Sequence, residues 1–167
     1  MEEKTVKASI VYHSVTGNTK IMAELVKQGC EKIKGVETEC FSIEETDNAY
    51  ISRSKAVILG APTYEGSVSW QMKRFLDEPS AELAGKLGGV FASQNWPGGG
   101  GASFAEMTMI AGMLVRGMII YSGGITEGKP FLHFGAVSAR APEGLYADRC
   151  VKLGENISRK AVRLFGE

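Results

Sequence analysis

Short apolar runs rich in β-branched residues alternate five times with stretches of helical periodicity. This alternation predicts an α/β fold with a parallel sheet and right-handed crossovers that place helices on both faces. At this length the expected form is a doubly wound five-stranded sheet of order 2-1-3-4-5, with a ligand at the switch point beside strand one. The first expected strand ends in the run 10–12, and the others are 36–41, 55–60, 87–92 and 118–121. The expected helices are 19–34, 44–50, 67–78, 102–116 and 144–165.

The first strand leads into a loop rich in hydroxyl groups and then into a helix start. Asn18 and Thr19 are both good N-cap residues, and the first helical turn contains no Asp or Glu. Because a helix start offers N–H groups and a partial positive charge, the loop favours an anion such as a phosphate. Gly17 lets the backbone approach that ligand closely. The phosphate-binding residues expected here are Ser14, Val15, Thr16, Gly17, Asn18 and Thr19.

The same loop argues against two other nucleotide-binding motifs. It contains no Gly-Lys-Ser/Thr, which disfavours a P-loop, and no Gly-x-Gly-x-x-Gly, which disfavours a dinucleotide site. A phosphate held by hydroxyls and backbone N–H groups, without a pairing cation, remains. In this respect the loop resembles the phosphate loop of flavodoxins, which bind flavin mononucleotide (FMN).

Two further loops are expected at the same sheet edge, because the carboxyl ends of strands one, three and four meet there. In the second loop, Tyr64 supplies an aromatic face for a flavin ring, and Gly66 allows a peptide that responds to protonation of ring nitrogen N5. The third loop offers polar groups to the pyrimidine edge of the ring, with Trp96 as a second stacking candidate. The residues expected to bind the cofactor are Pro62, Thr63, Tyr64, Glu65, Gly66, Ser93, Gln94, Asn95, Trp96, Gly98 and Gly99.

Composition narrows the class of protein. The 167 residues are 44% apolar and 23% charged, as in an ordinary globular protein, and predict one domain over 1–167. Lys and Arg balance Asp and Glu at 19 each, which disfavours nucleic acid or a membrane surface as the main partner. No signal peptide or membrane-spanning run is seen. Three widely spaced cysteines indicate reduced thiols and a cytoplasmic location, with no metal site.

Several residues are assigned from helical spacing or left open. Phe104, Met107, Ala111, Leu114 and Val115 are expected on the inward face of the helix at 102–116, and Cys30 is expected in the core. His13 and His133 could touch substrate or flavin or be structural. Arg116 could contact the flavin or a nicotinamide phosphate or end a helix in solvent. No acid–base or nucleophile constellation is found, so the chemistry is expected to be carried by FMN.

A wider resemblance rests on a combination of motifs. Beside the flavodoxin-like phosphate loop, several other stretches resemble the tryptophan-repressor-binding-protein family: Gly60 to Gly66, Gln71 to Asp77, Gly85 to Leu87, Gly98 to Gly101, Arg116 to Met118 and Phe134 to Ala136. Members of that family are flavodoxin-like NAD(P)H:quinone oxidoreductases. The resemblance implies FMN as cofactor, NAD(P)H as electron donor, a quinone or similar small molecule as acceptor, and often a homodimer or homotetramer.

The departures from that family leave an alternative open. The phosphate loop has the flavodoxin form, Val115 and Arg116 stand where the family typically carries histidine, and the stretch 78–83 is short. The main expectation is an FMN-dependent NAD(P)H:quinone oxidoreductase, and the alternative is a flavodoxin-type electron carrier between redox proteins. Such carriers tend to be strongly acidic, whereas the formal net charge here is zero.

Overall fold

The computed structural model describes residues 5–166, in which strands and helices alternate. The strands are β1 (Val6–Tyr12), β2 (Val36–Ser42), β3 (Ala56–Tyr64), β4 (Ser67–Val68), β5 (Leu87–Gln94), β6 (Ile119–Ile120) and β7 (Ala136–Ala139). The helices are α1 (Asn18–Glu31), α2 (Asn48–Arg53), α3 (Trp70–Asp77), α4 (Ala102–Val115) and α5 (Leu145–Phe165). The expected α/β class and parallel sheet are confirmed.

The sheet has the order β2-β1-β3-β5-β6, and all of these neighbours are parallel. It is not a sheet of five strands as expected. The fifth position is shared by β6, which pairs with β5 at Leu87 and Gly88, and by β7, which pairs with Phe91 to Gln94. The ladder along β5 is therefore interrupted at residues 89–90. A short strand, β4, also pairs antiparallel with the end of β3.

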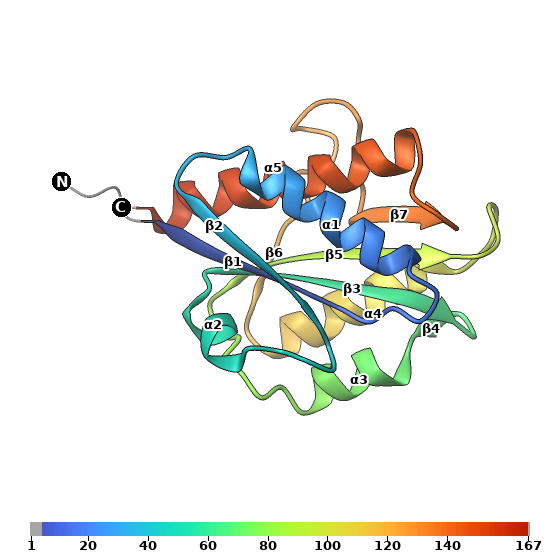
Figure 1. Cartoon of the computed structure of the whole chain (residues 1–167), viewed down its shortest axis with the longest axis horizontal. Coiled ribbons are helices and arrows are strands. Elements are labelled where there is room, and N and C mark those ends of the chain that lie inside the picture. Colours follow the sequence, from blue (N-terminus) through green and yellow to red (C-terminus); the bar gives the residue numbers. More distant parts are fainter. Residues whose placement is uncertain (1–4, 167) are drawn as a thin grey trace.

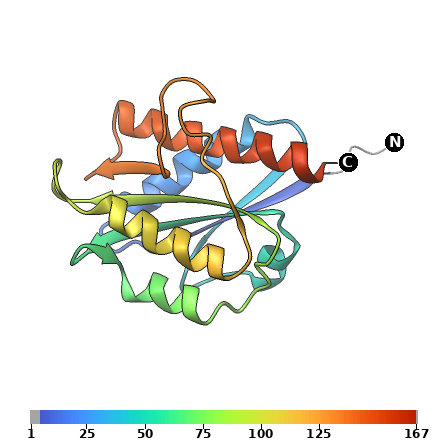
Figure 2. The same ribbon diagram turned by 180° about the vertical axis from the view of Figure 1, so that it is seen from behind.

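Two helical layers cover the sheet (Figure 1). Helices α1 and α5 lie on one face, and α2, α3 and α4 lie on the other, with α4 in front in the reverse view (Figure 2). Neighbouring residues of β1 point to opposite cores: Ile10 packs with Met22 of α1, and Val11 packs with Met72 of α3. Because both faces are buried, β1, β3 and β5 are almost continuously apolar, as is typical of central parallel strands.

Several element boundaries differ from the expected ones for local reasons. Helix α1 begins at Asn18 with Gly17 as its N-cap, so neither Asn18 nor Thr19 is the cap. Helix α3 begins at Trp70, because Ser67 and Val68 pair in β4 and the Ser69 hydroxyl then caps the helix. Strand β3 continues to Tyr64, so part of the second expected loop is strand.

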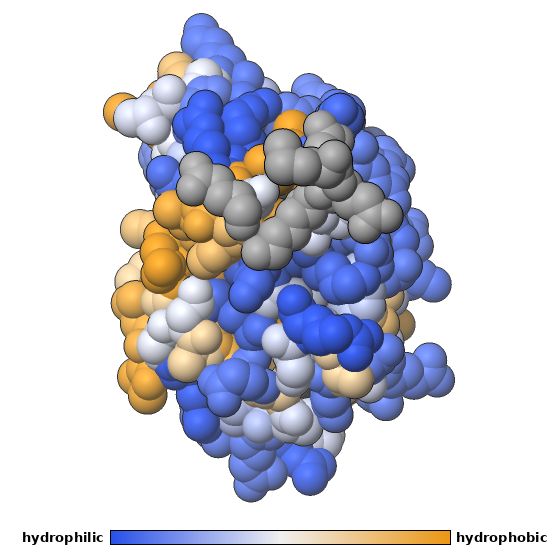
Figure 3. Space-filling view, turned by 90° about the vertical axis from the view of Figure 1, so that its left-hand side faces the viewer, coloured by the Kyte–Doolittle hydropathy of each residue, from blue (hydrophilic) through white to orange (hydrophobic). Residues whose placement is uncertain are grey.

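The inward face assigned to α4 is wrong. Phe104 and Val115 are 70% and 86% exposed, while the residues buried on α4 are Ala102, Ala105, Glu106, Met109, Ile110 and Met113. The helix is apolar nearly all round, so its spacing could not identify the buried side. In Figure 3, apolar side chains gather on the left flank, the side on which α4 lies in front in Figure 2.

The three cysteines are unpaired and lie in the core or at its margin. Cys30 and Cys150 are fully buried, which confirms the core assignment of Cys30, and Cys40 is half-buried. Burial raises the pKa of Cys30 to about 11 and the pKa values of Cys40 and Cys150 to about 12, so all three thiols stay protonated at neutral pH. Across residues 5–166, no helix combines the length and apolar character needed to cross a membrane.

Helices α1 and α5 approach closely through a pair of glycines. A Cβ on Gly29 would lie 2.0 Å from the Val151 carbonyl oxygen, and a Cβ on Gly154 would lie 2.0 Å from the Val26 carbonyl oxygen. These obstacles are backbone atoms, which cannot rotate aside. The two helices can therefore keep their separation only with glycine at both positions.

Replacing Gly29 by alanine is expected to destabilise the fold, although alanine is the better helix former. Overpacking against backbone should lower the free energy of unfolding by about 2 kcal/mol or more, beyond the ~1 kcal/mol gained in helix propensity. Urea denaturation of Gly29→Ala measures the change. Gln28→Ala, on the exposed side of the same helix, is the control and should remain close to wild type.

Candidate functional site

The carboxyl ends of β1, β3 and β5 bring the three expected loops together. The Thr19 hydroxyl in the first turn of α1 lies 2.8 Å from the Ser93 hydroxyl near the end of β5, and both residues are buried. The second and third loops also lie close together: a Cβ added to Gly101 would come within 3.3 Å of the Gly66 Cα. The predicted convergence of the three segments at one edge of the sheet is thus observed.

The first loop is organised around Ser14. Its hydroxyl oxygen accepts hydrogen bonds from the N–H groups of Gly17 at 3.2 Å and Lys20 at 3.3 Å. Gly17 has φ of 98°, a left-handed conformation that favours glycine, and since this N-cap residue has no side chain, the Ser14 hydroxyl accepts from the first turn in its place. With no acidic residue in the first turn of α1, the positive end of this helix faces the loop without an internal counter-charge.

The second loop is a tight hairpin between β3 and β4. Glu65 and Gly66 form its turn with φ values of 49° and 74°, and Tyr64 pairs with Ser67. Two successive residues with positive φ are the mark of a type I′ turn, which matches the twist of the paired strands. The hairpin presents the Tyr64 ring at the edge, where it is 43% exposed.

The third loop leaves β5 and leads to α4. The Gln94 side-chain oxygen accepts a hydrogen bond from the Ala102 N–H at 2.9 Å, which ties the start of α4 to the end of the strand. Between them, Trp96 is 73% exposed, and a Cβ on Gly98 or Gly99 would meet no atom within 4 Å. The tip of this loop therefore leaves open space around its backbone.

Ten of the expected residues line one small cavity of about 60 Å³ at this edge. Within it the buried Thr63 hydroxyl has no hydrogen-bond partner among the described residues. The lining residues are Val15, Thr16, Asn18, Thr19, Pro62, Thr63, Tyr64, Ser93, Gln94 and Asn95. The remaining expected residues stand on the same three loops outside the lining: Ser14, Gly17, Glu65, Gly66, Trp96, Gly98 and Gly99.

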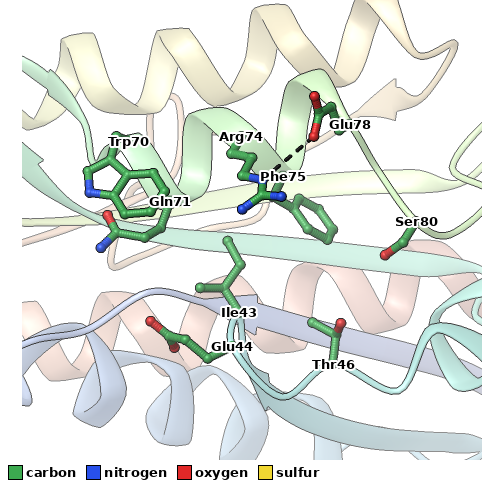
Figure 4. A pocket seen from close by; sticks show the side chains of 9 residues that line it. All are labelled: Ile43, Glu44, Thr46, Trp70, Gln71, Arg74, Phe75, Glu78 and Ser80. Carbon is green, nitrogen blue, oxygen red and sulfur yellow. Dashed lines mark ion pairs between the residues drawn. The ribbon is translucent and has the colours of Figure 1, made fainter.

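A larger hollow of about 370 Å³ lies away from these loops, between α3 and the residues that follow β2 (Figure 4). Trp70 and Gln71 stand on one side of it and Ile43 and Glu44 on the other, and the Arg74 Nε and a Glu78 carboxylate oxygen are 3.6 Å apart. None of the expected cofactor-binding residues lines this hollow. Its size alone does not make it the functional site.

The two histidines and Arg116 occupy three different environments. His13 is buried, and its Nε2 lies 3.7 Å from a Glu44 carboxylate oxygen; burial lowers its pKa, and Glu44 partly offsets that effect. Arg116 donates from its guanidinium to the carbonyls of Leu76 and Asp77, so it caps the end of α3. His133 is exposed and lines a separate cavity beside β7.

That separate cavity, of about 290 Å³, contains two polar groups that sequence reasoning missed. Glu106 is 2% exposed, and its Oε1 has no hydrogen-bond partner among the described residues, as is also true of the Arg149 Nε. The carboxyl group lies at the interruption of the β5 ladder: a Cβ on Gly135 would approach both it and the Val90 carbonyl oxygen. The sequence does contain a signal for Glu106, since it is the only charged residue in the predicted helix before Arg116.

Arg140 was also missed, because β7 was not expected. Its N–H donates to the Gln94 carbonyl oxygen at 2.7 Å, which places it at the carboxyl edge next to the third loop. β7 contains only small residues and one valine, so it lacks the apolar run from which the other strands were predicted.

Burial should make Glu106 a source of pH-dependent stability. Burial raises the pKa of its carboxyl group from 4.5 to about 8. Between pH 4.5 and about pH 8 the carboxyl group is therefore protonated in the folded state and ionised in the unfolded state. The stabilisation is complete below pH 4.5 and is lost as pH rises through about 8, with a slope of up to ~1.4 kcal/mol per pH unit.

Urea denaturation at several pH values compares wild type with Glu106→Gln, which cannot ionise. The free energy of unfolding of wild type should fall relative to that of the variant as pH rises from 5 to 8. A difference between the two proteins that does not change with pH would contradict the buried, protonated carboxyl group.

Known proteins provide an independent comparison. Residues 9–96 match the family model described as Flavodoxin domain. A flavodoxin from Clostridium saccharobutylicum is 34% identical over 160 residues, covering 95% of this chain and 99% of that protein. An NAD(P)H dehydrogenase (quinone) from Archaeoglobus fulgidus is 28% identical, covering 93% and 97% respectively. The solved structure of a flavodoxin from the domain Archaea gives a TM-score of 0.75 at 27% identity, covering 93% of this chain and 99% of that one.

The comparisons confirm the flavodoxin-like fold but not the expectation that the tryptophan-repressor-binding proteins are the nearest relatives. The flavodoxin from Clostridium matches at higher identity than the quinone dehydrogenase. This order agrees with the flavodoxin form of the Ser14 to Thr19 loop. Taken with the sheet order and the three joined loops, it leads to one conclusion: the chain belongs to the flavodoxin family.

Proposed function

We propose that this protein is a flavodoxin-type electron carrier, which holds FMN at the carboxyl edge of its sheet and exchanges electrons with redox proteins. The observation that carries the proposal is the junction of three loops there, with the Thr19 and Ser93 hydroxyls 2.8 Å apart and ten expected residues around one cavity. The higher sequence identity to the flavodoxin from Clostridium than to the quinone dehydrogenase from Archaeoglobus also supports it. The carrier was the alternative in the sequence analysis, and it is now the better supported function.

The residues present suit the phosphate end of FMN. The N-terminus of α1 has no acidic residue in its first turn, and a Cβ on Gly17 would meet no atom within 4 Å. We assign phosphate binding to backbone N–H groups and hydroxyls of Ser14, Val15, Thr16, Gly17, Asn18 and Thr19. When FMN binds, the Ser14 hydroxyl can donate to the phosphate while it continues to accept from Gly17 and Lys20.

The other two loops suit the flavin ring. Tyr64 and Trp96 are 43% and 73% exposed, so each can offer an aromatic face. Thr63 contributes a buried hydroxyl that still lacks a partner among the described residues. We assign ring binding to Pro62, Thr63, Tyr64, Glu65, Gly66, Ser93, Gln94, Asn95, Trp96, Gly98 and Gly99.

When bound, FMN supplies the redox chemistry by accepting and donating electrons. The three loops would hold the cofactor, and polar groups of the third loop would adjust its potential through hydrogen bonds. The peptide between Glu65 and Gly66, in the turn of the second loop, is the candidate to respond to protonation at N5 of a bound flavin. Because the formal net charge is zero, docking of redox partners should depend only weakly on ionic strength.

A second candidate is an NAD(P)H:quinone oxidoreductase, for which the specific observation is the Archaeoglobus relative that matches 93% of the chain. In that case a nicotinamide would reduce FMN directly, and a quinone or similar small molecule would accept the electrons. The cytoplasmic location, the extent of a single domain over 1–167, and the homodimer or homotetramer implied by the family resemblance remain predictions. The shuttling function itself needs only one chain.

Anaerobic addition of NADH and NADPH to the FMN-loaded protein distinguishes the two candidates. For a carrier, the visible flavin band should persist with either nucleotide and bleach only when a flavodoxin reductase is added as well. Rapid bleaching by a nucleotide alone, reversed by a quinone, would establish the reductase instead. A chain that does not bind FMN would contradict both.

The phosphate assignment is tested by Thr16→Asp. A carboxylate at this loop position would face the phosphate, and repulsion should weaken FMN binding by at least about a hundredfold, or ~3 kcal/mol. Quenching of FMN fluorescence on titration with apoprotein measures the dissociation constant. Thr5→Asp, an exposed threonine just before β1 at the opposite edge of the sheet, is the matched control and should bind FMN as wild type does. Equal affinity of both variants would refute the phosphate assignment.

A further inference from the structure

The cavity beside β7 is formed by three parts of the chain that lie far apart in sequence. α4 contributes Ser103 and Glu106, the segment 131–135 and Val137 of β7 form one wall, and α5 contributes Arg149. Because α4 and α5 cover opposite faces of the sheet (Figure 1), a cavity that both helices line spans the outer edge of the sheet, next to β7. It shares no lining residue with the small cavity between the three loops, so it is a separate site.

Two polar side chains line this cavity without a hydrogen-bond partner. The Glu106 side chain is buried, and its Oε1 is bonded to no group within residues 5–166. The Arg149 Nε is likewise buried and has no partner in the part of the chain that the structure describes. A buried polar group that makes no hydrogen bond is costly, and most of all when it is charged. A molecule that bonds to both groups would recover free energy that the chain alone does not.

The two groups do not satisfy each other. Neither the Glu106 Oε1 nor the Arg149 Nε is bonded to the other side chain. Burial alone raises the pKa of the Glu106 carboxyl group, whereas a guanidinium in contact with it would lower that pKa. The acid is therefore a neutral hydrogen-bonding group at one position in the cavity, and the arginine is a positive charge at another. A ligand that meets both must carry two polar groups that lie apart.

Apolar side chains form much of the remaining wall. Phe131 and Phe134 are 42% and 48% exposed, which places them where the cavity meets solvent, and Leu132 is buried. The volume of about 290 Å³ equals that of roughly ten water molecules and lies near the lower limit of ligand pockets. A flavin or a dinucleotide is too large for this volume, whereas one ring with short substituents fits. Such a ring would also cover the apolar wall, which water would leave wetted.

We propose that this cavity binds a small aromatic carboxylate that carries a hydroxyl or carbonyl group on the far side of its ring. The planar guanidinium of Arg149 matches the geometry of a carboxylate. Glu106, as a neutral acid, can donate to a carbonyl group, or both donate to and accept from a hydroxyl group. Phe131 and Phe134 offer aromatic contacts to the ring. An inorganic anion would meet only the arginine, and an uncharged ring would leave that charge unpaired, so neither would satisfy the whole cavity.

Isothermal titration calorimetry of the full chain with 4-hydroxybenzoate tests the site. Two analogues each lack one polar group: benzoate lacks the hydroxyl, and 4-hydroxybenzyl alcohol lacks the carboxylate. 4-Hydroxybenzoate should bind most tightly, and each analogue should bind at least about tenfold more weakly, because one buried protein group then stays unpaired. The affinity should be the same with and without FMN, since the two cavities share no lining residue. Binding that FMN abolishes would place the ligand in the other cavity and overturn the proposal.

Two substitutions assign the contacts within the cavity. Glu106→Leu removes the contact to the ligand hydroxyl, so 4-hydroxybenzoate should bind to it only as tightly as benzoate does, and the affinity for benzoate should not change. Arg149→Met keeps the unbranched stem and removes the charge, so it should weaken both carboxylates at least about tenfold and leave 4-hydroxybenzyl alcohol unaffected. Because the Glu106 Oε1 and the Arg149 Nε are unbonded within the described chain, both variants should keep the fold, as circular dichroism can verify.

Arg163→Met is the matched control. Arg163 is an exposed arginine in the last turn of the same helix as Arg149, outside the cavity lining, and the variant should bind all three probes as wild type does. A wild type that binds none of the probes at millimolar concentration would mean that the cavity holds water only, and this result would overturn the proposal. Equal affinity of wild type, Glu106→Leu and Arg149→Met for 4-hydroxybenzoate would overturn it as well. Neither result depends on whether the protein carries electrons.

Discussion

Parallel pairing of β1 with β3 and of β3 with β5 is the constraint on which the carboxyl edge depends. In a parallel sheet, all strands end at the same edge, so segments 74 residues apart in sequence can meet, as Thr19 and Ser93 do. The hydroxyl contact between these residues is buried, and it joins the start of α1 to the end of β5. The loops themselves are short and need few internal hydrogen bonds, because the sheet beneath them fixes their ends.

The central strands and their loops were predictable from sequence, and the periphery was not. The run from Ala56 to Leu59 is fully buried, because helices cover both faces of the sheet. A continuous apolar run is typical of such a central strand, whereas a strand with one face in water alternates apolar and polar residues. α4 was assigned the wrong inward face because its composition is apolar on every side, so periodicity carried no information. β7 was missed because its four residues owe their strand conformation to pairing with β5 and not to their own propensity. The buried face of α4 and the strand conformation of β7 were both set by contacts with other parts of the fold, which local sequence does not reveal.

The interrupted outer position of the sheet explains the environment of Glu106. Neither β6 nor β7 pairs with residues 89–90, and the chain between these two strands returns to the sheet through Gly135. A carboxyl group from α4 occupies the neighbourhood of this interruption, where apolar packing would otherwise be expected. Burial keeps the group protonated near neutral pH, so the acid behaves as a neutral polar side chain. The local irregularity of the sheet and the unusual acid belong to the same feature.

The close approach of α1 and α5 has a consequence for the order of events during synthesis. α1 carries the first loop at its N-terminus, yet it packs through Gly29 and Gly154 against α5, a helix that is made after all three loops. Until residues 145–165 have left the ribosome, α1 lacks the helix that it packs against most extensively, and the first loop lacks part of its support. A nascent chain that already contains all three loops of the carboxyl edge would thus still lack the helix that supports the first of them.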